Sequence, residues 1–146
     1  MEKNYKEALK AFNLSLKHGP NNKDSKYYRA ICHLDSDAPK KCIQDLNELI
    51  ELDPSYNQTI YVVLSIAYRR ENDLNSSLRA LTKGIQKFPK YVEAYQARGQ
   101  INIYLKKFEK ALIDFQNVIN LQPYNGSGYI GQADSMKGIG NFKGAL

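Results

Sequence analysis

The sequence has few of the side chains on which catalysis and metal binding depend. Its 146 residues include two histidines, two cysteines and no tryptophan. A catalytic centre needs a nucleophile, a base or a metal cluster within reach, and the sequence around His18 and His33 offers no such set. Cys32 and Cys42 lack the paired spacing of a zinc site. We therefore expect a protein that is not an enzyme, with no catalytic residues, no metal and no cofactor.

Long apolar runs are also absent. No segment approaches the roughly 20 apolar residues that cross a bilayer, and residues 1–12 lack the apolar middle of a secretion signal. This predicts a cytoplasmic protein without membrane contact, for which a ciliary or other cytoskeletal assembly is one setting, and whose cysteines remain thiols. The net charge is +6, but the lysines are scattered rather than gathered in a stripe, which disfavours nucleic-acid binding.

Proline is scarce, yet four of the five prolines are evenly spaced. Pro20, Pro54, Pro89 and Pro123 are separated by 34, 35 and 34 residues. A proline ends a helix, because it has no N–H to donate and it biases the preceding residue out of the helical region. An apolar stripe with helical spacing precedes each proline and predicts a helix there. The four stripes are Leu9, Phe12 and Leu16; Ile43, Leu46, Leu49 and Ile50; Leu78, Leu81 and Ile85; and Leu112, Phe115, Val118 and Ile119.

A second set of helices fits between each proline and the next stripe. We predict these first helices at residues 27–35, 60–70, 92–105 and 129–138, joined to the second helices by turns at 35–39, 71–73, 106–107 and 138–141. Pro39 suits a helix start, where the first N–H groups have no partner inside the helix. The glycine-rich stretch 138–144 has some likeness to a phosphate-binding loop, but no strand precedes it and its phase is that of an inter-helix turn.

The residues at fixed positions of this period resemble the tetratricopeptide repeat, in which aromatic, large, small and proline positions recur in order. Tyrosine stands here where the family often has tryptophan, and Arg98 and Asn102 stand where it has larger apolar residues. The best copy is Tyr61, Leu64, Ser65, Tyr68, Ser77, Leu81 and Pro89. The next is Tyr95, Gly99, Phe108, Ala111, Phe115 and Pro123, and a degenerate copy is Lys26, Arg29, Ala30, His33, Cys42, Leu46 and Pro54.

The resemblance implies an all-α solenoid, a right-handed superhelix of antiparallel helix pairs. Residues 1–146 then form one array: a partial repeat at 1–20 with a second helix only, full repeats at 21–54, 55–89 and 90–123, and a partial repeat at 124–146. We expect a longer parent protein or self-association through the uncapped ends. Small residues let neighbouring helices approach closely. They are Ala30, Ser65, Gly99 and Ala133 in the first helices, and Ala8, Cys42, Ser77, Ala111 and Ala145 in the second helices.

In this family the first helices line a concave groove, so the resemblance implies a site for a peptide or an amphipathic segment of a partner protein. The candidate groove residues are Tyr27, Ile31, Val62, Ile66, Arg69, Arg70, Gln96, Gln100, Ile103, Tyr104 and Ile130. The apolar members favour an apolar partner surface, Gln96 and Gln100 can bond to its backbone, and the arginine pair can meet an acidic residue. The alternative is that several of these side chains pack against neighbouring helices.

One known use of the family is to grip the acidic C-terminus of heat-shock chaperones with lysines, asparagines and an arginine. The corresponding positions here are Tyr27, Ile31, Val63, Glu93 and Ala97. None of these side chains is a cation, and Glu93 repels a carboxylate, so we expect no binding of such tails. The sequence thus predicts a protein-interaction scaffold or adaptor within a larger complex. The alternative from another class is an RNA-binding helical-repeat module.

Overall fold

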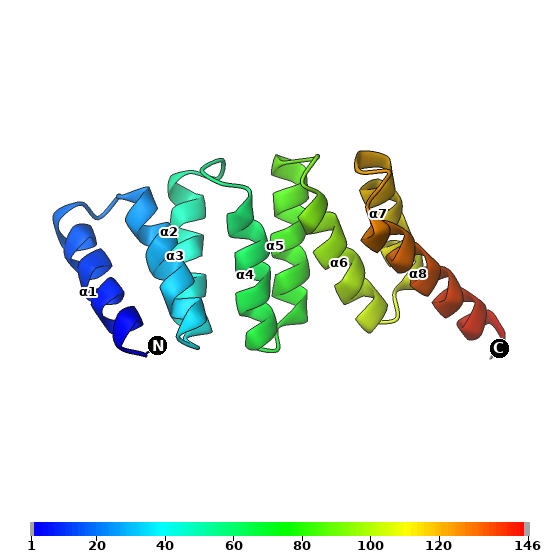
Figure 1. Cartoon of the computed structure of the whole chain (residues 1–146), viewed down its shortest axis with the longest axis horizontal. Coiled ribbons are helices and arrows are strands. Elements are labelled where there is room, and N and C mark those ends of the chain that lie inside the picture. The colour runs from blue at the N-terminus through cyan, green and yellow to red at the C-terminus, as the bar shows by residue number, and fades with distance from the viewer. Residues whose placement is uncertain (1, 145–146) are drawn as a thin grey trace. The chain divides into compact units, whose positions relative to one another are not determined.

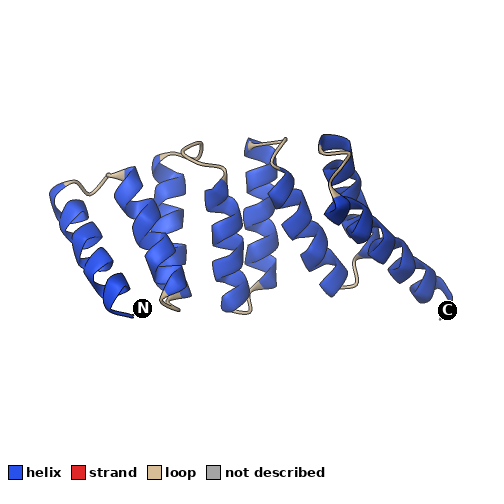
Figure 2. Ribbon diagram, viewed as in Figure 1, coloured by secondary structure: helices blue, strands red, loops and turns tan. Residues whose placement is uncertain are grey.

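The computed structural model describes residues 2–144, and these form eight α-helices and no strand (Figures 1 and 2). Contacts within the chain divide it into two compact units, Met1–Ser77 and Leu78–Leu146, with the division inside the fifth helix. The all-α prediction is confirmed. The helices are α1 (Glu2–His18), α2 (Lys23–Asp35), α3 (Pro39–Leu52), α4 (Thr59–Arg70), α5 (Leu74–Lys87), α6 (Val92–Tyr104), α7 (Phe108–Leu121) and α8 (Gly126–Gly144).

Unit 1 is a stack of helices in which α2 is central. It packs against α1, against its hairpin partner α3 and against the next first helix, α4. The side chain of Asn22 accepts the N–H of Ser25 at 2.9 Å and so caps the start of α2. Pro39 opens α3, as predicted. The interior is apolar and fully covered, with Ala30, Cys42, Leu46, Leu49, Ile60 and Ala67 at 0% exposure.

Unit 2 repeats this arrangement. The helix α6 packs against α7 and α8, and α7 packs against α8. Its core comprises buried side chains from α6 and α7, with partly buried ones around them. The buried members are Val92, Tyr95, Ala111, Phe115 and Val118, and the partly buried ones are Ile85, Ile103 and Leu121. In both units a first helix contacts the following first helix as well as its own partner, which is the packing of an α-solenoid.

The three turns inside the helix pairs are built alike. Asp37, Asn72 and Lys106 each adopt a positive φ, of 57°, 59° and 57°. The next N–H in each turn then donates back to a carbonyl five residues earlier, at 2.7, 2.9 and 2.8 Å respectively. This left-handed termination satisfies carbonyls at the helix end and reverses the chain in three residues. The predicted turns at 35–39, 71–73 and 106–107 are confirmed within one residue.

The predicted turn at 138–141 is wrong, because α8 continues from Gly126 to Gly144. Gly138 serves helix packing instead, since a β-carbon there would lie 2.3 Å from Cδ1 of Phe108. No glycine among the described residues has a positive φ. Because α8 does not turn back, Ala133 is exposed rather than packed in a helix pair, which corrects the prediction for that small position. Ala145 lies outside the described residues.

Two kinds of functional feature are absent from residues 2–144. None of the helices there has the length and apolar character required to span a bilayer. The same part of the chain contains no group of three or more histidine, cysteine or acidic side chains placed to hold a metal ion.

Candidate functional site

A recurring hydrogen bond sets how three of the four first helices, α4, α6 and α8, are rotated. The hydroxyl of Tyr61 donates to the carbonyl of Pro54 at 2.9 Å, and Tyr95 donates to Pro89 at 3.1 Å. Tyr129 makes the same bond to Pro123 at 2.9 Å. The aromatic position is therefore tied to the proline that precedes its helix. With that side fixed, the candidate groove residues lie on a different side of the same helices.

In unit 1, the candidate face lies on α2 and α4. Val62, Ile66 and Arg69 are spaced by four and three residues, so they share one side of α4. Ile66 is 36% exposed and Val62 is half-buried, whereas Leu64 is buried on the other side. Ile31 on α2 is also half-buried. The structure therefore places a partly exposed apolar stripe on adjoining helices of unit 1.

The side chain of Tyr27 packs in part against neighbouring residues of the same chain. Its hydroxyl lies 2.9 Å from Oγ1 of Thr59 at the start of α4. Its ring contacts those of Tyr28 and Tyr56, with centroid separations of 5.3 and 5.9 Å. This aromatic cluster joins the start of α2 to the loop before α4. Tyr27 thus borders the apolar stripe while linking two repeats.

The two arginines at the end of α4, Arg69 and Arg70, lie in different surroundings. Arg70 donates from Nη1 to the carbonyl of Leu34 at 2.5 Å, so it satisfies an end carbonyl of α2 and joins the two first helices. Arg69 is exposed on the same side as Val62 and Ile66. Arg69 is therefore the better placed of the pair to meet an acidic group on a ligand.

In unit 2, the candidate residues on α6 and α8 are more polar and more exposed. Gln96 donates to the side chain of Asn125 at 3.4 Å and to that of Ser127, so it fastens the loop before α8. Gln100 is exposed, and Ile103 packs partly on the core. The most exposed apolar candidates are Tyr104, at 76%, and Ile130, at 64%.

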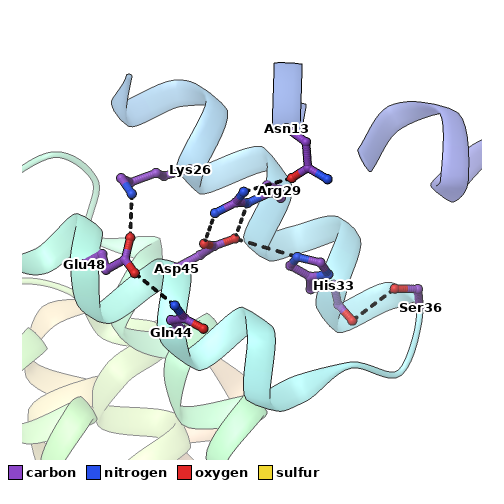
Figure 3. Close-up of polar contacts among 8 residues, drawn as sticks. All are labelled: Asn13, Lys26, Arg29, His33, Ser36, Gln44, Asp45 and Glu48. Carbon is purple, nitrogen blue, oxygen red and sulfur yellow. Dashed lines mark hydrogen bonds and ion pairs between the residues drawn. The ribbon is translucent and has the colours of Figure 1, made fainter. Parts of the chain in front are cut away.

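A polar cluster that the sequence analysis missed lies between α2 and α3 (Figure 3). Arg29 donates to both carboxylate oxygens of buried Asp45, at 2.8 and 2.5 Å, and to Asn13 of α1 at 2.9 Å. The hydrogen bond with Asp45 raises the pKa of Arg29. His33 lies 3.9 Å from the same carboxylate, but burial lowers the pKa of its imidazole. Lys26, in the aromatic position, bonds to Glu48 and lowers the pKa of that carboxyl.

Unit 2 contains a second cluster of the same design. Arg98 donates from Nε and Nη2 to Asp114, at 3.0 and 2.7 Å, and from Nη1 to Thr82 at 3.1 Å. The amide of Asn102 lies 3.5 Å from the same carboxylate. Both arginine–aspartate pairs are separated by 16 residues. An arginine in an apolar position with an aspartate 16 residues later was the sequence signal that could have revealed them.

Both clusters join neighbouring helices through hydrogen bonds between their own side chains. Among the described residues, no buried side-chain nitrogen or oxygen lacks a hydrogen-bond partner. The Asp45 and Asp114 carboxylates are each paired with a guanidinium group. Both thiols favour the protonated form, because burial raises the pKa of Cys42 to about 12 and also raises that of Cys32.

Comparison with known proteins places these repeats in context. Residues 92–125, which contain α6 and α7, match the family model described as Tetratricopeptide repeat. Human serine/threonine-protein phosphatase 5 is 33% identical over 86 residues, which cover 59% of this chain and 17% of the phosphatase. The chain therefore spans about a sixth of the length of that relative.

Solved structures with similar folds have lower sequence identity. A tetratricopeptide repeat protein from Parabacteroides merdae has a TM-score of 0.86 at 16% identity, covering 97% of this chain and 56% of that one. The first TPR of Spaghetti (RPAP3), bound to the HSP90 peptide SRMEEVD, has a TM-score of 0.72 at 19% identity. That match covers 81% of this chain and 93% of the other. Likeness at these identities establishes the solenoid fold.

Proposed function

Since the chain belongs to the tetratricopeptide-repeat family, we propose that it is a protein-interaction scaffold that holds a peptide or amphipathic helical segment of a partner on its first-helix faces. The scaffold acts within a larger complex, and these residues contribute no catalysis. The observation that carries the proposal is the stripe of Ile31, Val62 and Ile66 in unit 1, whose apolar side chains are only partly covered.

The chemistry of the stripe favours an apolar partner surface. Partly exposed apolar side chains on two adjoining helices offer a place where a partner can remove further apolar area from water, at about 25 cal/mol per Å². Arg69 at the edge of this stripe suits an acidic residue of the partner. In unit 2, the exposed amide of Gln100 suits the partner's backbone groups. An amphipathic segment with a negative end fits the unit 1 face.

Binding of selected peptides tests this proposal. Peptides enriched from a random library on the immobilised chain are titrated against the wild type, Ile66→Asp and Leu14→Asp. Leu14 is an apolar control that is 58% exposed on α1, outside the first helices. We expect Ile66→Asp to weaken binding about tenfold, or about 1.4 kcal/mol, and Leu14→Asp to leave it unchanged. Equal affinity for the wild type and Ile66→Asp contradicts the proposal.

RNA binding is the alternative function, and the combination of buried tyrosines and scattered lysines does not favour it. Recognition of single-stranded RNA uses exposed aromatic rings beside basic stripes. Tyr61 and Tyr95 are instead buried, with their hydroxyls bonded to proline carbonyls. Tyr104 and Tyr129 are exposed, but the lysines of the sequence are scattered rather than gathered in a stripe. We therefore propose no RNA-binding role. A gel shift with random RNA checks this, and retention that disappears as salt rises would favour the alternative.

A further inference from the structure

Unit 2 contains a pocket lined by side chains of α5, α6, α7 and the turn between α6 and α7. Its volume is about 330 Å³, within the range of about 300 to 1,000 Å³ that is usual for sites of small ligands. None of its lining residues is a candidate groove residue, so the pocket is separate from the first-helix face. The charged lining residues are Arg98, Lys107, Lys110 and Asp114. Three cations and one carboxylate leave an excess of positive charge that a small dianion would balance.

Arg98 has hydrogen-bond donors to spare in this pocket. Its Nε and Nη2 donate to Asp114, and its Nη1 donates to Thr82. A guanidinium group carries five N–H donors, one on Nε and two on each terminal nitrogen. One N–H of Nη1 and one of Nη2 therefore have no partner among residues 2–144. The planar fork of a guanidinium suits two oxygens of one oxyanion.

Two lysines at the start of α7 add further positive charge. Lys107 and Lys110 are exposed, and neither ammonium group makes a hydrogen bond or an ion pair within the described part of the chain. Lys107 stands at the N-cap of α7, where its side chain forms no cap. Cations near the start of a helix are opposed by the helix dipole, so this pair does not serve the stability of α7. Glu109 in the same turn does not line the pocket.

The repeat itself does not require lysine at these two positions. One repeat earlier, Asp73 holds the position of Lys107 and Ser76 holds that of Lys110. The carboxylate of Asp73 accepts the N–H of Ser76 at 2.9 Å, which is the ordinary way to cap a helix. In the repeat before that, Ala38 holds the position of Lys107. The lysine pair is therefore a feature of this pocket and not of the fold.

Apolar side chains and the charge of the whole unit indicate the kind of ligand. Leu78 and Ile113 also line the pocket, and Ile113 is 62% exposed. A free inorganic anion gains nothing from them, whereas an anionic group with an apolar neighbour can cover them. Unit 2 has ten basic and four acidic residues, but unit 1 has eleven of each. Unit 2 therefore attracts anionic partners over a distance.

We propose that this pocket binds a phosphate monoester dianion, carried on a phosphorylated serine or threonine of a partner segment that has an apolar neighbouring residue. Arg98 donates to phosphate oxygens, Lys107 and Lys110 neutralise the charge, and Ile113 contacts the apolar neighbour. The partner as source of the phosphate rests on the proposed scaffold function, whereas the affinity for phosphate rests on the pocket alone. The site distinguishes a phosphorylated partner from an unmodified one.

Titration with inorganic phosphate tests the pocket, followed by the methyl NMR signals of the isoleucines at pH 7.5. We expect saturable shifts of the Ile113 signals, with those of Ile66 unmoved. Lys110→Gln should weaken phosphate binding about tenfold, because it removes a hydrogen bond between charged groups. Lys106→Gln is the matched control, since it removes the same charge from an exposed residue that does not line the pocket. No saturable shift at Ile113, or an equal loss of affinity in both variants, overturns the proposal.

Three further ligands test the source of the phosphate. They are a short peptide with phosphoserine between two leucines, the same peptide without phosphate, and an oligouridylate. The phosphopeptide should bind about tenfold more tightly than inorganic phosphate, because a leucine covers Ile113. The unmodified peptide should leave the Ile113 signals unmoved. A phosphopeptide no tighter than phosphate overturns the partner as the source, and tighter binding of the oligouridylate overturns it in favour of nucleic acid. Binding of library peptides at Ile66 is measured separately, so either proposal can fail without the other.

Discussion

Arg98 on α6 binds the carboxylate of Asp114 on α7 through Nε and Nη2, and the pair recurs 69 residues earlier as Arg29 and Asp45. The spacing equals one 34-residue and one 35-residue period of the repeat. In the repeat between them, apolar Leu64 and Ala80 occupy these two positions. These two positions are therefore charged in two repeats and apolar in the third.

Removing one partner of such an ion pair should lower the free energy of unfolding more than replacing both partners with apolar residues. Asp114→Ala leaves the largely covered Arg98 without its partner, and we expect a loss of about 3 kcal/mol in the free energy of unfolding. The double variant Arg98→Leu, Asp114→Ala copies the third repeat and should lie within about 1 kcal/mol of wild type. Urea unfolding measures all three proteins. A double variant as unstable as Asp114→Ala would show that this contact depends on charge.

The turn after α6 contains a strained residue. Lys106 has a φ of 57°, a conformation that costs a residue with a β-carbon free energy and costs glycine little. We expect Lys106→Gly to raise the free energy of unfolding by about 0.5 to 1 kcal/mol. Lys107→Gly serves as the control, because Lys107 has an ordinary φ of −91°. Thermal melts that show no gain for Lys106→Gly, or an equal gain for the control, contradict this explanation.

His33 should make stability depend on pH near neutrality. Burial lowers its pKa in the folded state more than Asp45 raises it, so the unfolded chain binds a proton more readily. Stability is then greatest above the ordinary histidine pKa, near 6.5, and falls as the pH drops through it. His33→Asn, which copies Asn102, should weaken this dependence. Chemical denaturation at pH 7.5 and pH 5.5 measures the free energy of unfolding of both proteins. The same difference between the two pH values in wild type and variant would rule out His33 as the source of the pH dependence.

The first helices should not bind an acidic chaperone tail. Glu93 and Ala97 on α6, and Val63 on α4, stand where the family pattern has cationic or amide side chains. Titration with SRMEEVD, the HSP90 peptide held by the similar solved domain, should give no saturable binding at micromolar concentrations. The double variant Glu93→Lys, Ala97→Arg is titrated beside the wild type. It should bind the peptide more tightly, because it places two cations where the family pattern has them. Micromolar binding by the wild type would contradict this prediction.

Local sequence signals predict the helix pairs because helix ends and periodic burial depend on near neighbours. Pro89 ends α5 by its own geometry, and Gly99 is small because Phe115 lies over it. The exception is α8, where glycines at 138–140 suggested a turn. A turn there needs a second helix to pack back on α8, whereas Gly138 instead accommodates Phe108. Whether a glycine ends a helix or accommodates a neighbouring ring is decided by tertiary packing and not by the local sequence.

The candidate site was less predictable, because exposure depends on which helices meet. The repeat phase places Gln96 and Arg70 on the groove side, but it cannot show that Gln96 bonds to Ser127 or that Arg70 bonds to the Leu34 carbonyl. The partner of Arg98 was missed for a similar reason. A pair 16 residues apart becomes visible only when two antiparallel helices are in register.

A partner held on the first helices should contact Ile66 of α4 and leave the second helices untouched. The most direct measurement is the methyl NMR spectrum of the chain, isotope-labelled at isoleucine, with a saturating library-selected peptide. Ile66 reports on the first-helix face of unit 1, and Ile113, which is 62% exposed on α7, reports on the second-helix side. We predict that the Ile66 methyl signals shift and those of Ile113 do not. Shifts of the Ile113 signals with those of Ile66 unmoved would show that the peptide binds the second helices and not the first-helix face.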